Sequence, residues 1–478
     1  MPKKEEKLGI SVKKSEDFSE WYTQVIQKAE LADYTSVSGC MVFKPYSFFM
    51  WEIVQSEVDK KFKEIGIKNC YFPLFIPESL LKKEESHVKG FNPEVAWVTH
   101  AGNTKLNERL AVRPTSETIM YESFAKWIRS WRDLPLRLNQ WNNIVRWEFK
   151  HPIALLRTRE FLWNEGHTVF ASKEEAEKEK EQILNIYSDF LNDYMALYGV
   201  IGKKTEKEKF PGAEATYSIE LFLPSGKAIQ GPDFHSDGQN FAKAFNIKFL
   251  DKDEKEDYVW QNTFAITTRM LGVMIGVHGD DNGLVMPPKM APVQVVVVPI
   301  IFDKTKDKVL KKADEIKSKL KGLRVEVDDR EGYSSGWKFN EWELKGVPVR
   351  LEIGPRDIEK SQVILVRRDN GKKEPVKISE LNKKTDKVLE DIHENLYRKS
   401  KKFFNDNTIK VKNFNEFKKG INDKKLVLAN FCNKVKCEEE IKDKTGGATS
   451  RVIIKEEKGK CVHCGKEGNF LVYFARAY

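Results

Sequence analysis

Arginine and glutamate side chains cluster in one stretch of the chain, where they could bind an anion. Arg146 and Glu148 are two positions apart, so on a β-strand both side chains would project from the same face. After a loop, Arg157 and Thr158 add a second cation and a hydroxyl. Such a group could bind a phosphate or a carboxylate together with a hydrogen-bond donor. An ion pair between neighbouring strands also explains Arg146 and Glu148, and for this pair taken alone it is the favoured interpretation.

A hydroxyl and a carboxylate follow a proline and could bind an ammonium group. Thr115 and Glu117 are two residues apart, and the carboxylate would supply charge while the hydroxyl supplies direction. An ordinary helix start is the other interpretation, because Thr115 and Ser116 are good N-cap residues and Met120 begins an apolar face. Taken alone, these residues favour the helix start.

A third segment places a cation at the start of an apolar helix. Thr267 and Arg269 precede a predicted helix in which Gly272 and Gly276 are four residues apart. The two glycines would form a flat stripe for close packing. Arg269 could reach a triphosphate from this position, although a buried helix with a solvated end explains the segment equally well.

Four of the six cysteines form two close pairs near the C-terminus, and their spacing suits a metal. The pairs are Cys432 with Cys437 and Cys461 with Cys464. Four thiolates in two tight turns predict a tetrahedral zinc site, in which His463 could replace one ligand. Four unrelated buried cysteines would seldom show this pattern. The other two, Cys40 and Cys70, stand alone and are expected to be small buried apolar side chains.

The overall composition and charge limit the classes of protein to which this chain could belong. The 478 residues carry 82 basic and 72 acidic side chains, with a net charge of +10. Both signs are spread along the chain, so a polyanionic partner is permitted but not required. No stretch is apolar enough for a bilayer, and no apolar run follows the charged N-terminus, so no membrane association or secretory signal is expected. Six cysteines without such a signal do not suggest a disulfide scaffold, and we expect a cytoplasmic protein.

The candidate residues need regular elements to position them, and the apolar pattern predicts several. Residues 45–65 carry apolar side chains at helical spacing, and Gly66 is a natural stop. Residues 140–170 alternate as strands do, interrupted by a loop. Ser172 and Glu175 form a capping pair that opens another amphipathic helix.

After two prolines at 287 and 288, strands alternate with helices. The expected strands are 293–300, 324–327, 349–353 and 362–366, with helices through 309–320 and 335–345 between them. This alternation indicates a compact α/β domain of about a hundred residues. A helix over 379–400 leads to the Lys-rich end that holds the cysteine pairs. We therefore expect three domains, over residues 1–288, 289–385 and 386–478.

Together the chemical segments resemble, in the right order, the three signature motifs of class II aminoacyl-tRNA synthetases. Gly66 to Pro73 resembles motif 1, Arg146 and Glu148 fall at the Arg-x-Glu of motif 2, and Arg269 falls at the motif 3 arginine. The resemblance narrows to prolyl-tRNA synthetases of the archaeal and eukaryotic type through three longer stretches. These are Arg-Pro-Thr-Ser-Glu-Thr at 113–118, Leu-Arg-Thr-Arg-Glu-Phe-Leu-Trp-Asn-Glu-Gly-His at 156–167 and Asn-Glu-Trp-Glu-Leu-Lys-Gly-Val-Pro at 340–348.

This resemblance, which runs from about residue 17 to Tyr478, implies the architecture. The fold class would be α/β: an α+β catalytic domain with the antiparallel sheet of class II synthetases, a mixed-sheet α/β anticodon-binding domain and a small zinc-binding α+β domain. The resemblance to motif 1 implies a homodimer. About a hundred residues separate Glu165 from Arg269, which leaves little room for the editing domain that bacterial-type relatives insert there. We therefore expect no cis-editing.

The resemblance also implies a reaction and its partners. ATP would activate L-proline to prolyl-adenylate, and the prolyl group would then pass to the 3′ end of tRNA(Pro). Mg²⁺ would accompany ATP, and Zn²⁺ would be structural. Because such chemistry depends on positioning and charge stabilisation, no covalent catalytic residue is expected.

Residue roles follow from the same resemblance. Arg146 would bridge the proline carboxylate and the α-phosphate, and Arg269 would hold the outer phosphates. The proline site would consist of Thr115, Glu117, Arg146, Phe161, Trp163, His167 and His235. The ATP site would consist of Arg146, Glu148, Arg157, Thr158, Gln230, Thr267 and Arg269. Glu343, Lys345, Arg350 and Arg356 would read the anticodon, Cys432, Cys437, Cys461 and Cys464 would hold zinc, and Tyr478 resembles a C-terminal aromatic residue that approaches the active site.

One segment departs from the family pattern. Relatives usually carry Thr-Ser-His where this chain has Asp233, Phe234 and His235. A carboxylate near phosphate is repulsive unless a cation lies between them, so Asp233 is not expected to touch ATP directly. An added metal contact is the accompanying hypothesis.

Two other functions remain open at this point. A sister synthetase for threonine, glycine or histidine would need a different pocket, and the threonine enzymes place a metal there. No spare set of cysteines and histidines precedes residue 300, which favours proline. A synthetase-like protein that binds tRNA or regulates without charging it would be consistent with the altered segment around Asp233.

Overall fold

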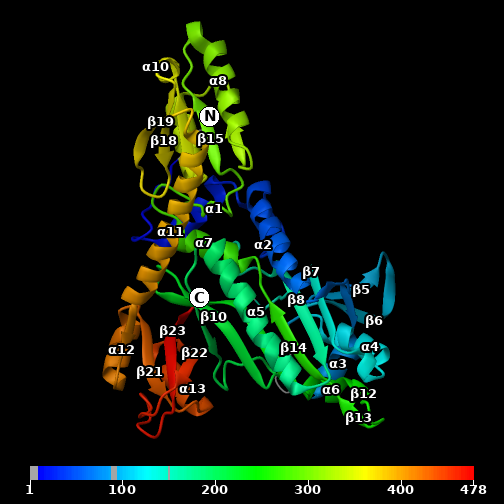
Figure 1. Ribbon diagram of the computed structural model, residues 1–478. Coiled ribbons are helices and arrows are strands. Elements are labelled where there is room, and N and C mark those ends of the chain that lie inside the picture. The colour runs from blue at the N-terminus through cyan, green and yellow to red at the C-terminus, as the bar shows by residue number, and fades with distance from the viewer. Residues whose placement is uncertain (1–8, 88–93, 149–150) are drawn as a thin grey trace.

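The computed structural model describes residues 9–87, 94–148 and 151–478, and a long sheet organises it (Figure 1). Within these residues, the largest sheet has 11 strands in the order β20-β21-β23-β22-β9-β10-β11-β14-β8-β7-β3. Its N-terminal members are β3 (Lys68–Asn69), β7 (Leu136–Val145), β8 (Glu160–Phe170), β9 (Val200–Lys203), β10 (Ala215–Phe222), β11 (Lys227–Gly238) and β14 (Trp260–Ala265). Its C-terminal members are β20 (Thr408–Lys410), β21 (Leu426–Phe431), β22 (Ala448–Glu456) and β23 (Phe470–Ala477). Strands from both ends of the chain therefore share one sheet.

Three helices cover one face of this sheet and confirm the apolar patterns. They are α2 (Pro45–Glu64), α5 (Lys173–Asp193) and α7 (Arg269–His278), which Figure 1 shows stacked against the strands. The hydroxyl of Ser172 caps α5 by accepting from the backbone N–H of Glu175. The stripe on α7 is also confirmed, because a Cβ at Gly272 would lie 2.7 Å from the Tyr22 hydroxyl oxygen. Tyr22 belongs to α1 (Phe18–Lys28), so glycine permits that close approach.

The expected strand does not reach the arginine and glutamate of the first cluster. β7 ends at Val145, and Glu148 lies in an exposed turn after it. The backbone N–H of Arg146 still bonds the carbonyl oxygen of Arg159 at 2.8 Å, but the next N–H turns to the carbonyl oxygen of Glu94. The prediction that the side chains of Arg146 and Glu148 share a strand face is therefore wrong.

The second domain confirms its predicted alternation of strands and helices. Its sheet has the order β16-β15-β17-β18-β19, with β15 parallel to β16 and β17 and with antiparallel pairing of β18 to both β17 and β19. The elements are β15 (Val295–Pro299), η2 (Asp303–Thr305), α8 (Lys306–Lys319), β16 (Val325–Val327), α9 (Ser335–Leu344), β17 (Val349–Ile353), α10 (Pro355–Glu359), β18 (Gln362–Arg367) and β19 (Lys373–Lys377). The apolar face of α8 is fully buried on this sheet. The mixed sheet agrees with the expected fold class.

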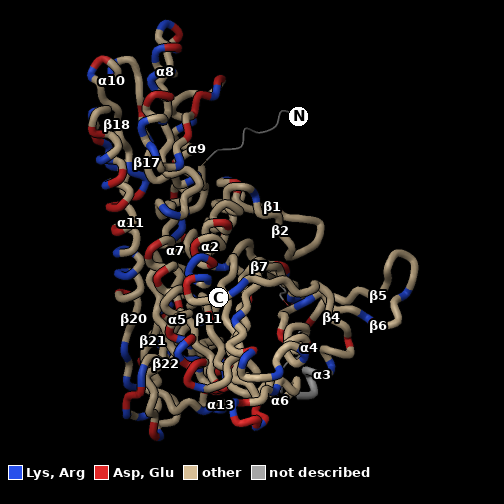
Figure 2. Tube along the Cα trace, turned by 45° about the vertical axis from the view of Figure 1, so that its right-hand side comes forward, with Lys and Arg blue, Asp and Glu red and all other residues tan. Residues whose placement is uncertain are grey.

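A long helix joins this domain to the C-terminal strands. α11 (Leu381–Asp406) runs along one side of the molecule, and Lys and Arg recur along it (Figure 2). It passes through residues 385 and 386 without a break, so the predicted boundary between the second and third domains falls inside a helix. β22 pairs with β9, and β23 runs parallel to β11, with Ala477 opposite Ala228. The third domain thus extends the catalytic sheet.

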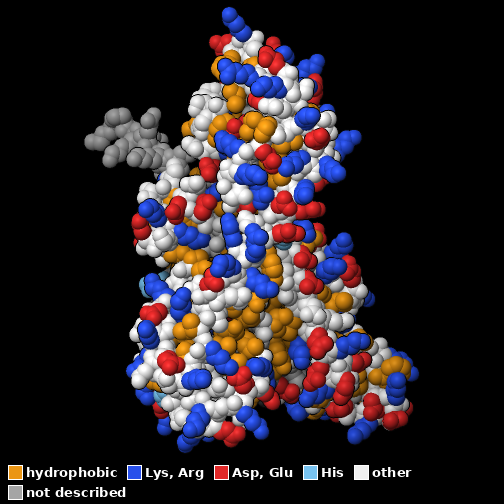
Figure 3. All heavy atoms as spheres, turned by 60° about the vertical axis from the view of Figure 1, so that its left-hand side comes forward, with side chains coloured by type: hydrophobic (Ala, Val, Ile, Leu, Met, Phe, Trp, Pro, Cys, Tyr) orange, Lys and Arg blue, Asp and Glu red, His pale blue; other side chains and the backbone are white. Residues whose placement is uncertain are grey.

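The remaining described elements lie at the margins of these sheets. They are β1 (Ala32–Tyr34), β2 (Met41–Phe43), β4 (Phe75–Pro77), α3 (Glu78–His87), β5 (Trp97–Ala101), β6 (Thr104–Val112), α4 (Glu117–Trp127), η1 (Trp131–Asp133), α6 (Asn240–Phe245), β12 (Lys248–Leu250), β13 (Glu256–Tyr258), α12 (Phe414–Asn422) and α13 (Val435–Thr445). In the part of the chain that the structure describes, no helix combines the length and apolar character that crossing a bilayer requires. Figure 3 shows both signs of charge interspersed on one face, as the sequence predicts.

Candidate active site

Residues from five elements that are distant in sequence meet around one cavity of about 300 Å³ on the large sheet. The predicted residues that line it are Thr115, Glu117, Arg146, Phe161, Trp163, His167, Gln230, His235, Thr267 and Arg269. They come from the start of α4, the end of β7, the strands β8 and β11, and the start of α7. The cavity therefore brings the two arginines and the carboxylate into one place.

Strand β8 supplies one wall through alternation. Phe161, Trp163, Glu165 and His167 are two residues apart from one another, so they project from one face. All four line the cavity. Glu165 was missed as a site residue, although its position in this alternation was the signal that could have found it.

The two arginines are held by backbone carbonyls and aromatic rings. The Arg146 guanidinium lies 5.5 Å from the ring centroid of Trp163, and its Nε donates to the carbonyl oxygen of Pro114 at 3.1 Å. Arg269 donates from Nε to the carbonyl oxygen of Leu156 and from Nη1 to that of Gln230, both at 3.2 Å. These contacts leave each guanidinium with further N–H donors for a ligand.

Burial shapes the charge of this region. It lowers the pKa of Arg269 to about 10; the Asp233 carboxylate opposes that shift, and the neighbouring Arg146 and Arg157 guanidiniums add to it. Like charges this close repel one another, which raises the free energy of this region. A polyanionic ligand would relieve that cost.

The opposite side of the cavity is acidic. Thr115 Oγ1 donates to Glu117 and lies 3.0 Å from Glu165 Oε1, which also accepts from the backbone N–H of Ser116 at 2.7 Å. Burial and the Glu165 charge raise the pKa of Glu117, although the nearby His167 lowers it. For Glu165, burial raises the pKa, but the hydrogen bond and charge of His167 and the hydrogen bonds from Ser116 outweigh burial and lower the pKa to about 2. Glu165 is thus a fixed anion, and Glu117 is the carboxylate with room for a cation.

A metal ion is a second possible occupant of this acidic side. One ligand atom each from Glu117, Glu165 and His167 lie within 4.8 Å of one another. Both oxygens of Glu165 are already bonded, however, since Gln140 Nε2 donates to Oε2 at 3.1 Å. A hydroxyl and one accessible carboxylate fit a cationic nitrogen better than they fit a metal.

Three predicted ATP residues lie outside this cavity. Arg157 lines an adjoining cavity of about 190 Å³ that shares Gln230 and Arg269 with the first. Thr158 is buried, and its hydroxyl donates to the carbonyl oxygen of Glu160. Glu148 is exposed and lines neither cavity. The structure therefore brings Arg157 next to the site but does not bring Thr158 or Glu148 into it.

The altered segment forms its own contacts inside the cavity. Asp233 Oδ2 accepts from Gln230 Nε2 at 2.7 Å, and Oδ1 lies 3.8 Å from His235 Nε2. Burial lowers the pKa of His235, although Asp233 opposes this effect. The His235 ring stacks on Phe210 at 4.6 Å. Phe210, like Thr216 on β10, lines the cavity without a sequence signal that pointed to it.

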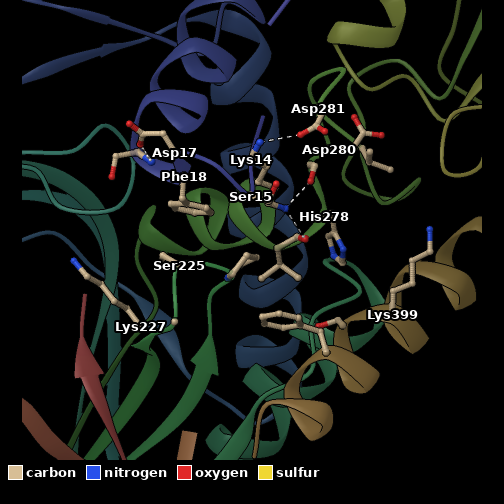
Figure 4. Close-up of a pocket in the computed structure, with 18 of the residues that line it drawn as sticks. Lys14, Ser15, Asp17, Phe18, Ser225, Lys227, His278, Asp280, Asp281 and Lys399 are labelled. Carbon is tan, nitrogen blue, oxygen red and sulfur yellow. Dashed lines mark hydrogen bonds between the residues drawn. The ribbon is translucent and has the colours of Figure 1, made fainter. Parts of the chain in front are cut away.

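The chain's last residue, Tyr478, lines both the 190 Å³ cavity and a larger one. Its backbone N–H bonds the carbonyl oxygen of Ala228, and its carbonyl oxygen accepts from Arg157 Nη1 at 3.4 Å. The larger cavity, about 940 Å³, lies between α1, the end of α7 and α11 (Figure 4). There Lys14 donates to backbone carbonyls at the end of α7, which caps that helix. This placement supports the expectation that Tyr478 approaches the active site.

The cysteine pairs converge as their spacing predicted. One Sγ from each of the four lies within 4.8 Å of the others, with 3.8 Å between Cys437 and Cys461 and 4.0 Å between Cys432 and Cys464. Tetrahedral Zn–S bonds of about 2.3 Å place sulfurs about 3.8 Å apart. The cluster therefore fits a zinc ion. His463 Nδ1 lies 3.3 Å from the Cys437 sulfur, beside the cluster.

The four anticodon candidates do not form one group. Glu343 and Arg350 line a cavity of about 240 Å³ with Arg367 and other basic residues. Lys345 instead pairs with Glu341 at 3.1 Å and with Glu30 of the catalytic domain at 3.3 Å. Arg356 is exposed on α10, away from that cavity's lining. Lys345 thus joins two domains.

Comparison with known proteins agrees with this arrangement. Residues 97–278 match the tRNA synthetase class II core domain (G, H, P, S and T), residues 294–387 match an anticodon binding domain, and residues 414–478 match the prolyl-tRNA synthetase C-terminal domain. The chain is 49% identical over 477 residues to proline–tRNA ligase 2 of Bacillus cereus, covering 99% of each. It is 50% identical over 484 residues to proline–tRNA ligase of Alkaliphilus oremlandii, covering 100% of each.

A solved structure extends the likeness to three dimensions. The crystal structure of prolyl-tRNA synthetase from Cryptosporidium parvum, complexed with halofuginone and AMPPNP, superposes with a TM-score of 0.94 at 46% identity, covering 100% of this chain and 99% of that one. Full-length identity, the matched C-terminal domain and the converged cavity all agree. The chain belongs to the prolyl-tRNA synthetase family of class II aminoacyl-tRNA synthetases.

Proposed function

We propose that the cavity around Arg146, Arg269 and Glu117 carries the proline–tRNA ligase reaction. A proline carboxylate oxygen attacks the α-phosphorus of ATP, the bond to the bridging oxygen breaks, and pyrophosphate leaves. A ribose hydroxyl of the tRNA 3′ end then attacks the prolyl carbonyl, and AMP leaves. The observation that carries the proposal is the meeting of two cations and a carboxylate at one cavity.

The acidic side suits the amino acid. Glu117 would accept from the cationic ring nitrogen, and Thr115 would orient it. The aromatic rings of Phe161 and Trp163, whose centroids are 5.9 Å apart, would wall the five-membered ring. The residues proposed to hold proline are Thr115, Glu117, Arg146, Phe161, Trp163, His167 and His235.

The basic side suits the nucleotide. Arg146 would neutralise charge shared by the carboxylate and the α-phosphate, and Arg269 and Arg157 would hold the outer phosphates. Gln230 and Thr267 line the same space and would contact ATP. The ATP contacts of Glu148 and Thr158 are supported by the family resemblance alone. Mg²⁺ would bind together with the nucleotide. A metal contact from Asp233 stays a hypothesis, because that carboxylate already accepts from Gln230.

Proline-dependent exchange of pyrophosphate into ATP tests this function. The chain should catalyse exchange with proline and give no comparable exchange with threonine, glycine or histidine. Charging of tRNA(Pro) should follow under the same conditions. Exchange without charging would favour a synthetase-like regulator, and no exchange with proline would reject the proposed reaction.

Absence of alanyl-tRNA hydrolysis is the next expected outcome. Every residue between Glu165 and Arg269 lies in the described chain, in α5, α6, β9 to β14 and their connections. The interval thus completes the catalytic domain. Purified chain incubated with alanyl-tRNA(Pro) should leave the ester as stable as a buffer control does. Hydrolysis that rises with protein concentration would contradict this prediction.

The second domain would bind the tRNA anticodon. Prolyl anticodons carry two guanines, and arginine and glutamate are suitable partners for guanine edges. Glu343 and Arg350 share one cavity and are the better candidates. Lys345 and Arg356 keep only the support of the family resemblance, since Lys345 is paired across domains.

The cysteine cluster would hold a structural zinc ion, with Cys432, Cys437, Cys461 and Cys464 as ligands. Replacing Cys464 by serine (C464S) should weaken zinc binding at least about 100-fold and lower the melting temperature, because a neutral hydroxyl replaces a thiolate ligand. Metal analysis by mass spectrometry after dialysis measures this. Cys70→Ser, outside the cluster, should retain about one zinc per chain. Full zinc retention in C464S would refute the assignment.

Assembly and boundaries complete the proposal. Tyr71, Phe75 and Trp97 are exposed aromatic side chains beside or on the sheet β4-β6-β5, close to the segment that resembles motif 1. Exposed aromatic surface of this kind supports a homodimer.

We retain the domain division 1–288, 289–385 and 386–478, with α11 shared by the last two. A cytoplasmic location follows from the reaction, because ATP and tRNA(Pro) meet there.

A further inference from the structure

Arg451, on β22 of the C-terminal domain, reaches into the nucleotide side of the catalytic domain. It lines the 190 Å³ cavity together with Arg157, Gln230, Arg269 and Tyr478. Its side chain is only 7% exposed. Ala477 and Tyr478 of the same domain also line this cavity, and nothing in the residue spacing pointed to Arg451.

A buried ion cluster holds Arg451 in place. Its Nε donates to Glu220 Oε2 at 2.9 Å, and its Nη2 lies 2.8 Å from the same oxygen as an ion pair. Lys204 Nζ donates to Glu220 Oε1 at 2.5 Å, and the Ser218 hydroxyl donates to the same oxygen at 3.1 Å. Both carboxylate oxygens are therefore engaged. Two cations share this carboxylate, and the side chain of Glu208 lies close enough for its charge to act on both of them.

The cluster borders the residues proposed to hold phosphate. Glu220 on β10 lies directly opposite Gln230 on β11 in the sheet register. The carbonyl oxygen of Gln230 accepts from Arg269. Arg451 also lowers the pKa of Arg269 through its charge, after the larger effects of burial, Asp233, Arg146 and Arg157. Charge on Arg451 thus acts on the phosphate-binding arginine.

Guanidinium groups gathered at one cavity have a chemical consequence. Their planar sets of N–H donors match the oxygens of a phosphate and bind them through charge-assisted hydrogen bonds. The cavity holds guanidiniums from three separate segments, and Glu220 is bonded to both of its cationic neighbours. A dianionic or more highly charged group is the ligand chemistry that fits.

We propose that Arg451 is a positioning residue that completes a subsite for pyrophosphate and for the β- and γ-phosphates of ATP. Through this residue, the C-terminal domain forms part of the nucleotide site. The inference deepens the proposed function and rests on it for the identity of the ligand. A purely structural role is the competing explanation, in which the Arg451–Glu220 pair only joins β22 to the catalytic sheet.

Arg451→Met (R451M) tests the subsite in the full-length zinc-loaded chain. Glu220 keeps Lys204 as a partner in this variant, so no buried carboxylate is left alone. We expect the KM for pyrophosphate and for ATP in the exchange reaction to rise about tenfold, as loss of one charged contact predicts. The KM for proline should stay within about twofold. Arg451→Lys should give an intermediate value, because it restores the charge but not the fork geometry.

Lys455→Met is the matched control, because Lys455 lies on the same strand, is exposed and pairs only with Glu457 among the described residues. It should leave all three KM values unchanged. The subsite would be overturned if the KM values of R451M for pyrophosphate, ATP and proline all rose equally. An unchanged KM for pyrophosphate in folded R451M would also overturn it. If R451M does not fold, an R451K variant with wild-type KM for pyrophosphate overturns it instead.

Direct calorimetry with inorganic pyrophosphate separates the two proposals. Wild-type chain should bind pyrophosphate more tightly than R451M by about tenfold, whether or not exchange occurs. If the wild-type chain binds pyrophosphate more tightly than R451M but catalyses no proline-dependent exchange, the proposed function is rejected and the anion site is kept. Proline-dependent exchange, together with equal pyrophosphate affinity in the wild-type chain and R451M, would keep the proposed function and reject the anion site.

Discussion

Replacing Arg146 by methionine (R146M) should lower kcat/KM for proline in the exchange reaction by about 10²–10³-fold, as removal of one preorganised donor at a developing charge does. Arg146 is the cation between the proposed carboxylate and α-phosphate positions. Its guanidinium is preorganised by the rings of Phe161 and Trp163 and by the carbonyl of Pro114. Most of the loss should appear in kcat, because charge on the α-phosphate grows in the transition state.

The control for this effect is Arg132→Met. Arg132 is exposed in η1 and stacks on Trp131, outside both cavities. It should keep wild-type kcat/KM. Arg146→Lys should recover only part of the rate, because a lysine cannot reproduce the planar fork of donors. A folded R146M chain with wild-type kcat/KM would remove Arg146 from the reaction.

The local pattern of residue types predicted the helices and strands well, because each element depends on residues that are close together in sequence. The period of apolar residues in α2 and α8, and the capping pair of α5, depend on contacts within a few positions. The two cysteine pairs predicted the four-cysteine cluster for the same reason, because the members of each pair are close together in sequence. These elements could be read without knowledge of the rest of the chain.

The active site could not be built from spacing alone. Thr115, Arg146 and Arg269 each had an ordinary structural explanation, and only their order along the chain, matched to a family, brought them together. Their meeting depends on pairing of β7, β8, β14 and β11, which are separated by long connections. Such pairing is fixed by the whole fold and leaves no local pattern.

The errors have equally definite causes. Glu148 was placed on a strand, but β7 ends at Val145, where tertiary hydrogen bonds replace the ladder. Arg451 gave no signal because its partner, Glu220, is 231 positions away. The anticodon contact predicted for Lys345 stays a prediction, but its ion pair with Glu30 crosses a domain contact that no local stretch of sequence reveals.

Glu117 should make proline binding depend on pH. Only the ionised carboxylate can pair with the cationic ring nitrogen, so affinity falls as pH drops through the pKa of Glu117 in the folded chain. Burial and the Glu165 charge raise that pKa above its usual value of 4.5, although His167 opposes them. The KM for proline should therefore begin to rise at a higher pH than an ordinary glutamate would cause. Exchange kinetics between about pH 8 and about pH 5 measure this.

Glu117→Gln (E117Q) isolates the carboxylate from other titrating groups. Loss of a charged hydrogen bond should raise the KM for proline at neutral pH by about 10- to 100-fold. The variant should also lose the acid-side rise in KM, because the amide does not titrate. Glu122→Gln, on the exposed face of the same helix and paired with Lys126, should keep the wild-type profile. Because Glu165 stays ionised through its own bonds to Ser116 and Gln140, an unchanged pH profile in E117Q would assign the titration to a group other than Glu117.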